Sequence, residues 1–175
     1  MIAMEKTRRR RFTGENRIVV GVGDAACSSD PDAVIVTHAL GSCLGIGLYD
    51  PLARIAGLFH PMLPAARITP ERAKGNPYAC VDTGFHRFMT AMTTLGARKE
   101  RLIVKVAGGG CMYATSDTDF FDIGKRNYLA LRSILEACGM SIAGSCVGGT
   151  RAQTVFLHVA SGRMIVSIDG EDQSL

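Results

Sequence analysis

Several features are missing from this chain, and each absence narrows its class. Tryptophan does not occur at all. No apolar run is long enough to cross a membrane, so we expect no membrane insertion. No two of the six cysteines form a Cys-x-x-Cys pair, which argues against a zinc site and against dithiol redox chemistry.

The amino-terminal region also lacks the pattern of a secretory signal. Its basic cluster is followed by the polar residues 13–16 rather than by an apolar stretch. We therefore expect a cytoplasmic protein whose cysteines stay reduced, most of them as small buried apolar residues.

The positive charge is confined to the start of the chain. Its basic residues are Lys6, Arg8, Arg9, Arg10, Arg11 and Arg17, and they are opposed only by Glu5 and Glu15. This segment accounts for the whole formal net charge of +4. We expect residues 1–16 to form a disordered basic tail. No aromatic residues are interleaved with the charges, so no nucleic-acid partner is predicted.

The remaining residues, 17–175, have the length of one domain with a substantial core. Apolar and β-branched runs predict strands, and two longer segments carry apolar residues at helical spacing. The expected strands are 17–21, 33–37, 43–49, 54–60, 101–107, 141–147, 154–159 and 164–168. The expected helices are 78–95 and a second one that has Asp122 as its N-cap and ends at Gly139.

This succession predicts an α+β fold, a layered α/β sandwich with mostly antiparallel sheet and two long helices. Strands 43–49 and 54–60 are expected to form a hairpin. Residues 61–77 are predicted to be a loop. The glycines at 21 and 23 loosely match a dinucleotide-binding fingerprint, which we reject because 27–32 is typical of a loop rather than of a helix start.

Two apolar segments bring chemically active side chains toward the expected hairpin. Residues 34–43 contain Thr37 and end in Gly41-Ser42-Cys43, and residues 57–64 contain His60. A thiol needs a nearby base to become a nucleophile at neutral pH, and imidazole is suited to that task. A Thr37 hydroxyl could accept the imidazole N–H and fix its tautomer. Backbone N–H groups around Ser42 and Cys43 could stabilise an oxyanion.

Alternatives remain open on residue chemistry alone. A single cysteine on an apolar strand is usually a core residue, and a histidine before a proline is usually a loop residue. His38, His86 and His158 compete with His60 as the base, and only geometry can dismiss His38. Ser42 is a rival nucleophile, although its surroundings lack the G-x-S-x-G spacing of a hydrolase elbow.

Further motifs reveal a family resemblance. Thr37 and Leu40-Gly41-Ser42-Cys43 are followed by His60 with Met62-Leu63-Pro64, Tyr78, Asp82-Thr83, Ala107-Gly108-Gly109 with Met112, Ile123-Gly124, Arg126-Asn127, and Gly148-Gly149 with Arg151. In this order and spacing, from about residue 18 to 168, the sequence resembles the CheD family of chemoreceptor glutamine deamidases.

The resemblance implies a layered α/β sandwich with catalytic Cys43, His60 and Thr37. Gly41 and Ser42 are expected to bind the substrate or its oxyanion. It implies hydrolysis of receptor glutamine side chains to glutamate and ammonia in chemotaxis, with no metal or organic cofactor. The implied partners are methyl-accepting chemotaxis receptors and a CheC-type phosphatase.

A non-catalytic adaptor that binds such a phosphatase or a receptor is the alternative, and nucleic-acid binding through the tail is a weaker one. Three features depart from the family pattern: Pro61, a polar insertion at 116–119, and the arginine-rich tail.

Overall fold

The computed structural model describes residues 16–111 and 123–175. Within these ranges the strands are β1 (Asn16–Val20), β2 (Asp24–Ser28), β3 (Ala33–Leu40), β4 (Leu44–Asp50), β5 (Ile55–His60), β6 (Ile103–Gly108), β7 (Ile142–Val147), β8 (Gln153–His158), β9 (Met164–Ile168) and β10 (Glu171–Ser174). The helices are α1 (Pro70–Gly75), α2 (Val81–Thr94) and α3 (Ile123–Ala137), with short 3-10 turns at Ala66–Ile68, Pro77–Ala79 and Lys99–Arg101.

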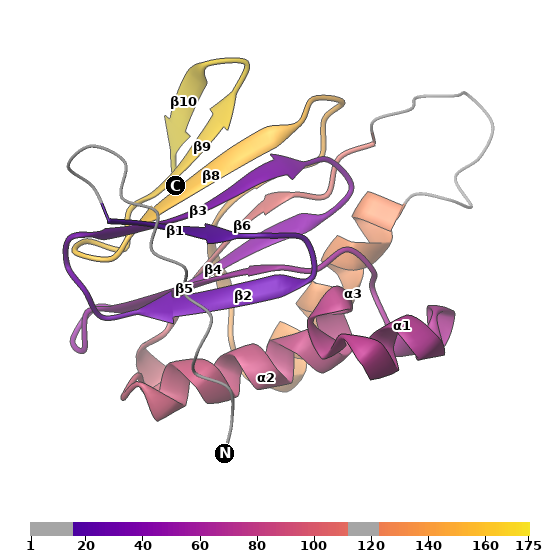
Figure 1. The fold of residues 1–175 in the computed structure, drawn as a ribbon, viewed down its shortest axis with the longest axis horizontal. Helices are drawn as coiled ribbons and strands as arrows, with labels where there is room; N and C mark the ends of the chain where they lie inside the picture. Colours follow the sequence, from indigo (N-terminus) through magenta and orange to yellow (C-terminus); the bar gives the residue numbers. More distant parts are fainter. Residues whose placement is uncertain (1–15, 112–122) are drawn as a thin grey trace.

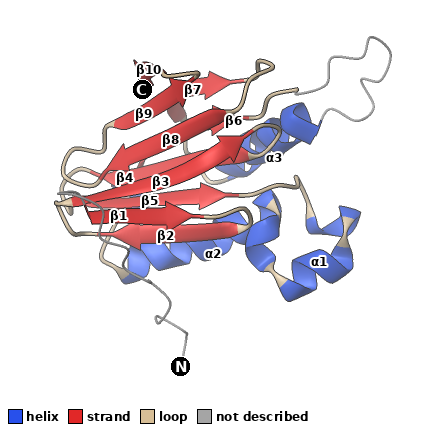
Figure 2. Ribbon diagram, turned by 45° about the horizontal axis from the view of Figure 1, so that its top comes forward, coloured by secondary structure: helices blue, strands red, loops and turns tan. Residues whose placement is uncertain are grey.

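The strands form two five-stranded sheets that pack face to face (Figure 1). The outer sheet has the order β1-β3-β8-β9-β10, and the middle sheet has the order β2-β5-β4-β6-β7. Only β1 with β3 and β6 with β7 pair in parallel. Helices α2 and α3 pack on the far face of the middle sheet, and α1 lies beyond the ends of the strands on the same side (Figure 2). The predicted α+β sandwich, its mostly antiparallel sheets and its two long helices are confirmed.

Strand β4 shows why the middle sheet is buried on both faces. Leu44, Ile46 and Leu48 belong to the core that the middle sheet shares with α2 and α3. Their neighbours Gly45 and Gly47 face the outer sheet, where an added Cβ would meet side chains of β3, β8 and β9. Alternation of large and absent side chains therefore lets the outer sheet approach closely while the helices pack on the opposite face.

The predicted hairpin is confirmed. Strands β4 and β5 pair antiparallel, with Ile46 opposite Phe59. The backbone N–H of Leu44 donates to the carbonyl of Pro61 at 3.2 Å, which extends the pairing beyond the strand ends. The start of β4 and the end of β5 consequently lie side by side.

Several boundaries were wrong. The segment expected to be a loop at 27–32 begins inside β2, a short edge strand without β-branched residues that gains its hydrogen bonds from β5. The segment expected to be a loop at 61–77 contains α1, which starts with Pro70 at its first turn, a position that suits proline. The last strand, β10, is fully exposed and offered no apolar pattern.

Other predictions fall elsewhere on the chain. Most of the basic tail 1–16, the N-cap at Asp122 and the polar insertion 116–119 lie outside the described residues. Within the part of the chain that the structure describes, no helix is long and apolar enough to span a membrane.

Candidate active site

The site lies between the two sheets, at the end where β4 begins and β5 finishes. Continuing the register of Ile46 with Phe59 places His60 opposite Gly45, and Cys43 is the diagonal neighbour on the same face. Both side chains therefore point toward the outer sheet, and Cys43 packs at the margin of the core between the sheets. The absence of a side chain at Gly45 makes room for Leu40 of β3, and Thr37 of the same strand reaches His60.

Thr37 fixes the imidazole of His60. The Thr37 hydroxyl oxygen lies 2.7 Å from His60 Nδ1 and 2.8 Å from the carbonyl oxygen of Val20. A carbonyl can only accept a hydrogen bond, so the Thr37 hydroxyl donates its one proton to the carbonyl of Val20. The hydroxyl oxygen must then accept a hydrogen bond from the Nδ1–H of His60. The ring proton consequently sits on Nδ1, and Nε2 carries a free lone pair.

Burial keeps this imidazole neutral. His60 is 1% exposed, and burial lowers its pKa from the ordinary value of 6.5 to about 4. Its Nε2 is buried and has no hydrogen-bond partner among the described residues. An unpartnered buried acceptor is costly, so the ring presents an unsatisfied lone pair on its Nε2 side.

The pKa of the Cys43 thiol is set by two opposing influences. Burial raises the pKa of its thiol, and a hydrogen bond from its own backbone N–H offsets part of that rise. The residue is only partly buried, unlike His60 and Thr37. Burial therefore favours the neutral form of both groups, the thiol of Cys43 and the imidazole of His60.

The loop before the thiol is held by its carbonyl groups. We call residues 41–43 the nucleophile loop. Its carbonyls accept hydrogen bonds from Gly110 N–H at 2.8 Å, from Asn127 Nδ2 at 2.9 Å and from Gly109 N–H at 2.8 Å, in chain order. All three donors come from the end of β6 or from α3, on one side of the loop.

This arrangement aims the backbone N–H groups of the loop. In a trans peptide the C=O of one residue and the N–H of the next point in opposite directions. The carbonyls of Gly41 and Ser42 point at their donors, so the N–H groups of Ser42 and Cys43 point away from β6 and α3. Backbone N–H groups beside a thiol are candidates to stabilise an oxyanion.

The other histidines are placed elsewhere. His38 is exposed beyond Thr37, and its ring meets Phe156 edge-on at 6.5 Å between centroids. The strand is irregular here, since its register shifts between Thr37 and Leu40 and Ala39 has a φ of 57°. Since Thr37 faces the middle sheet, the alternation of side chains along β3 turns His38 to the opposite face. His86 is exposed on α2, and His158 is half-buried on β8.

Two polar residues near the site were not assigned a role from the sequence. Asn127 is fully buried on α3 and contacts the nucleophile loop. Gln153 is 3% exposed, and its Oε1 accepts the Gly108 N–H at 2.9 Å. Asn127 lies on the same helical stripe as Leu131 and Leu135, and a polar residue on an apolar stripe is the signal that could have revealed it.

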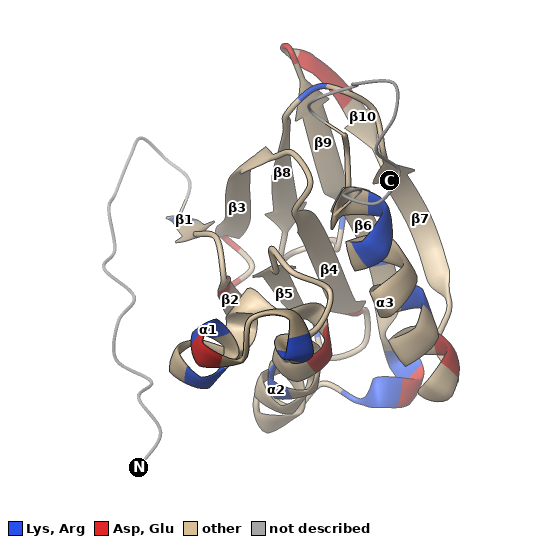
Figure 3. Ribbon diagram, turned by 90° about the vertical axis from the view of Figure 1, so that its right-hand side faces the viewer, with Lys and Arg blue, Asp and Glu red and all other residues tan. Residues whose placement is uncertain are grey.

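One charged residue, the exposed Asp24 of β2, is the cross-strand partner of His60. Figure 3 shows Lys and Arg on α1 and α3, and Asp and Glu on the β9–β10 hairpin. Strands β3 and β5 contain no charged residue, and the acidic residue of β4, Asp50, ends that strand far from Cys43.

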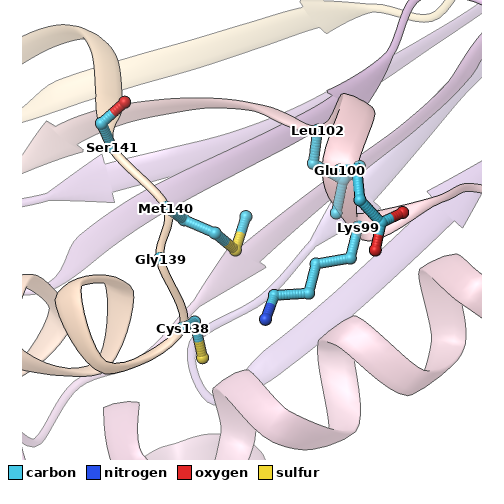
Figure 4. Close-up of a pocket in the computed structure, with 7 residues that line it drawn as sticks. All are labelled: Lys99, Glu100, Leu102, Cys138, Gly139, Met140 and Ser141. Atoms are coloured by element: carbon cyan, nitrogen blue, oxygen red, sulfur yellow. The ribbon is translucent and has the colours of Figure 1, made fainter.

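A cavity of about 320 Å³ lies at the other end of β6 and α3 (Figure 4). Its walls include Lys99, Cys138 and Ser141. It shares no residue with the group around Cys43. Within residues 16–111 and 123–175, no three His, Cys, Asp or Glu side chains are grouped so as to hold a metal ion.

Fold and site together define a class: an α+β sandwich that presents a cysteine, a histidine and a threonine at one end of its two sheets. A family model described as CheD chemotactic sensory transduction matches residues 62–168. The chain belongs to the CheD family.

Curated relatives agree over most of their length. A protein of Solibacter usitatus named "Probable chemoreceptor glutamine deamidase CheD" is 45% identical over 91% of this chain and 93% of its own. A second, from Anaeromyxobacter dehalogenans and named "Probable chemoreceptor glutamine deamidase CheD 2", is 43% identical over 85% and 92%. A solved Neisseria meningitidis structure of the DUF152 family covers 75% of this chain and 63% of its own, with 11% identity and a TM-score of 0.44.

Proposed function

We propose that this protein hydrolyses the side-chain amide of glutamine residues in chemoreceptors, giving glutamate and ammonia, with Cys43 as the nucleophile. The observation that carries the proposal is the pair of hydrogen bonds of Thr37, to Val20 and to His60. They leave Nε2 of His60 as an unprotonated base in a buried neutral site. The names of the curated relatives supply the substrate class.

The reaction begins at the thiol. The Cys43 sulfur attacks the carboxamide carbon of glutamine, and its proton passes to His60 Nε2. The amide oxygen becomes an oxyanion that accepts hydrogen bonds from the N–H groups of Ser42 and Cys43. His60 then gives the proton to the amide nitrogen, the carbon–nitrogen bond breaks, and ammonia leaves behind a thioester.

The second half of the reaction restores the enzyme. Neutral His60 now takes a proton from water, whose oxygen attacks the thioester carbon. The carbon–sulfur bond breaks, glutamate is released and the proton returns to the sulfur. Thr37 accepts the hydrogen bond from the Nδ1–H of His60 throughout, so it holds the ring in the orientation that both steps need. Every proton is carried by His60 or water, so the steps need no further group.

Replacing Cys43 by alanine tests the proposal. We expect Cys43→Ala to abolish ammonia release from a chemoreceptor cytoplasmic fragment and the accompanying conversion of glutamine to glutamate by mass spectrometry. Cys146→Ala is the matched control, because Cys146 is also half-buried and lies on β7 away from His60. Undiminished release by Cys43→Ala would refute the proposal and favour the adaptor alternative, in which the chain only binds a receptor or a CheC-type phosphatase.

A further inference from the structure

Asn127 connects the two segments that carry the proposed nucleophile and base. Its Nδ2 donates to the carbonyl of Ser42 at 2.9 Å and to the carbonyl of Met62 at 3.2 Å. Ser42 immediately precedes Cys43, and Met62 follows His60 by two residues. One side-chain amide from α3 thus donates one hydrogen bond to each of the two segments.

The orientation of this amide is fixed by its neighbours. The two backbone carbonyls are acceptors only, so the NH₂ group has to face them and the flipped orientation is excluded. Asn127 is fully buried, and its Oδ1 has no hydrogen-bond partner among the described residues. Both N–H groups of the amide are therefore hydrogen-bonded, although its oxygen has no partner, which is costly for a buried acceptor.

The backbone of α3 reinforces the contact. A Cβ at Gly124 would lie 2.5 Å from the Gly109 oxygen and 2.6 Å from the Gly110 oxygen, so the first turn of α3 rests directly on that segment. The N–H groups of Gly109 and Gly110 are the other two donors to the nucleophile loop. The start of α3 and the loop are consequently held in one fixed relation, alongside β4 and β6 (Figure 3).

We propose that Asn127 is a positioning residue that sets the distance between the Cys43 sulfur and His60 Nε2 by bridging Ser42 and Met62. The inference rests on the proposed function and deepens it. Without the bridge, the carbonyls of the partly buried Ser42 and Met62 lose this donor and the Ser42–Cys43 peptide is free to rotate. The N–H of Cys43, which belongs to that peptide, then leaves the oxyanion position.

The test uses Asn127→Leu and the volume-matched Asn127→Asp in the full-length chain. Leucine removes both N–H donors of the side-chain amide. Aspartate keeps the shape but places a carboxylate oxygen against the carbonyl oxygens of Ser42 and Met62, which repel it. We expect kcat for ammonia release from a chemoreceptor cytoplasmic fragment to fall about 10- to 100-fold, with KM changed less than about threefold, because a small misplacement of reacting groups has this effect.

Alkylation of Cys43 by iodoacetamide, followed by mass spectrometry, is expected to change in the opposite direction. Releasing the nucleophile loop exposes a partly buried thiol, so its alkylation should become about fivefold faster or more. The matched control is Leu135→Ala, which opens the core at the other end of the same helix. Below its melting temperature it should keep the wild-type kcat and alkylation rate.

Loss of stability in the Asn127 variants with kcat and alkylation unchanged would overturn the inference. Should neither variant fold, the side-chain NH₂ protons of wild-type Asn127 are followed by NMR in D₂O: slow exchange supports the bridge, and fast exchange overturns it. The proposed function fails separately. It fails if the wild type releases no ammonia, or if Cys43→Ala releases as much ammonia as the wild type. The alkylation rates of the Asn127 variants then still decide whether the bridge holds the loop.

Discussion

The hydroxyl of Thr37 and Nδ1 of His60 lie 2.7 Å apart, across the junction of the outer and the middle sheet. The contact joins two different sheets, so the orientation of the imidazole depends on their packing. It also replaces the carboxylate that commonly holds a catalytic histidine with an uncharged group. A neutral partner is consistent with a site in which burial lowers the pKa of the histidine to about 4.

Removing the Thr37 hydroxyl should therefore impair catalysis more than folding. In Thr37→Val the Nδ1–H of His60 loses its acceptor and the proton is free to move to Nε2, where it blocks the base. We expect kcat to fall about 10- to 100-fold. Thr37→Ser keeps the oxygen and should stay within about threefold of the wild type. Equal activities of the two variants in the ammonia-release assay would contradict this role.

The depressed pKa of His60 makes a prediction about stability against pH. The unfolded chain binds a proton on this histidine near pH 6.5, and the folded protein does so only near pH 4. The unfolded state thus holds more protons between these values, so the free energy of unfolding decreases as pH falls from 6.5 to 4. Above 6.5 the contribution is constant, and over the whole window it amounts to about 3 kcal/mol.

His60→Gln lacks this titration and is the comparison. Urea unfolding of both proteins at a series of pH values should give curves that converge as pH falls through the window. Parallel curves would show that His60 is not held neutral in the folded state. The buried Asp50 does not interfere, because its interactions hold its pKa well below the usual range and its contribution is lost only at lower pH.

Asp50 should matter for stability and not for chemistry. The Asp50 carboxylate is fully buried, forms a salt bridge with Arg101 at 2.6 Å and accepts the backbone N–H groups of Leu52, Ala53 and Arg98. Asp50→Ala leaves these donors without their acceptor, and we expect a loss of about 3 kcal/mol in the free energy of unfolding. Among folded molecules kcat should be unchanged, since Asp50 ends β4 at the opposite end from Cys43.

An exposed ion pair supplies the control for Asp50. Arg151 and Asp169 form a salt bridge with side chains that are 68% and 53% exposed. Arg151→Ala should change the free energy of unfolding by less than about 0.5 kcal/mol. Thermal and urea unfolding of the two variants measure the contrast, and a similar loss in both would show that burial of Asp50 contributes nothing.

The sequence predicted elements with a clear apolar period and missed those without one. Strands β3, β4 and β5 consist of apolar residues bounded by turn residues, and the hairpin between β4 and β5 followed from its Asp50-Pro51 turn. Strands β2 and β10 lack such runs and depend on hydrogen bonds from neighbouring strands. No local pattern records that dependence.

The site could be predicted in part for the same reason. The hairpin placed Cys43 near His60 because antiparallel neighbours end together, and a hydroxyl near an imidazole made Thr37 a candidate. Neither the pairing of β1 with β3 nor the packing of the two sheets was visible in the sequence, so neither the Val20 acceptor nor the separation of His38 from the site could be foreseen. The bridge through Asn127 depends on how α3 packs, which is a tertiary property.

Gly108 provides the sharpest test of how the nucleophile loop is held. It has a φ of 87°, a left-handed conformation that side chains rarely adopt. A Cβ at this position would collide with the carbonyl oxygen of Cys43. Gly108→Ala should therefore strain the backbone and also push Cys43 away from His60, because backbone atoms cannot move aside as a side chain does.

Gly139→Ala separates these two effects. Gly139 has a φ of 66°, so alanine is strained there too, but an added Cβ meets nothing within 4 Å. We expect Gly139→Ala to lose about 1 kcal/mol of stability and to keep the wild-type kcat. Gly108→Ala should lose more stability and at least about tenfold in kcat, measured by ammonia release. If both alanine variants kept full kcat, the nucleophile loop would not depend on its contact with the end of β6.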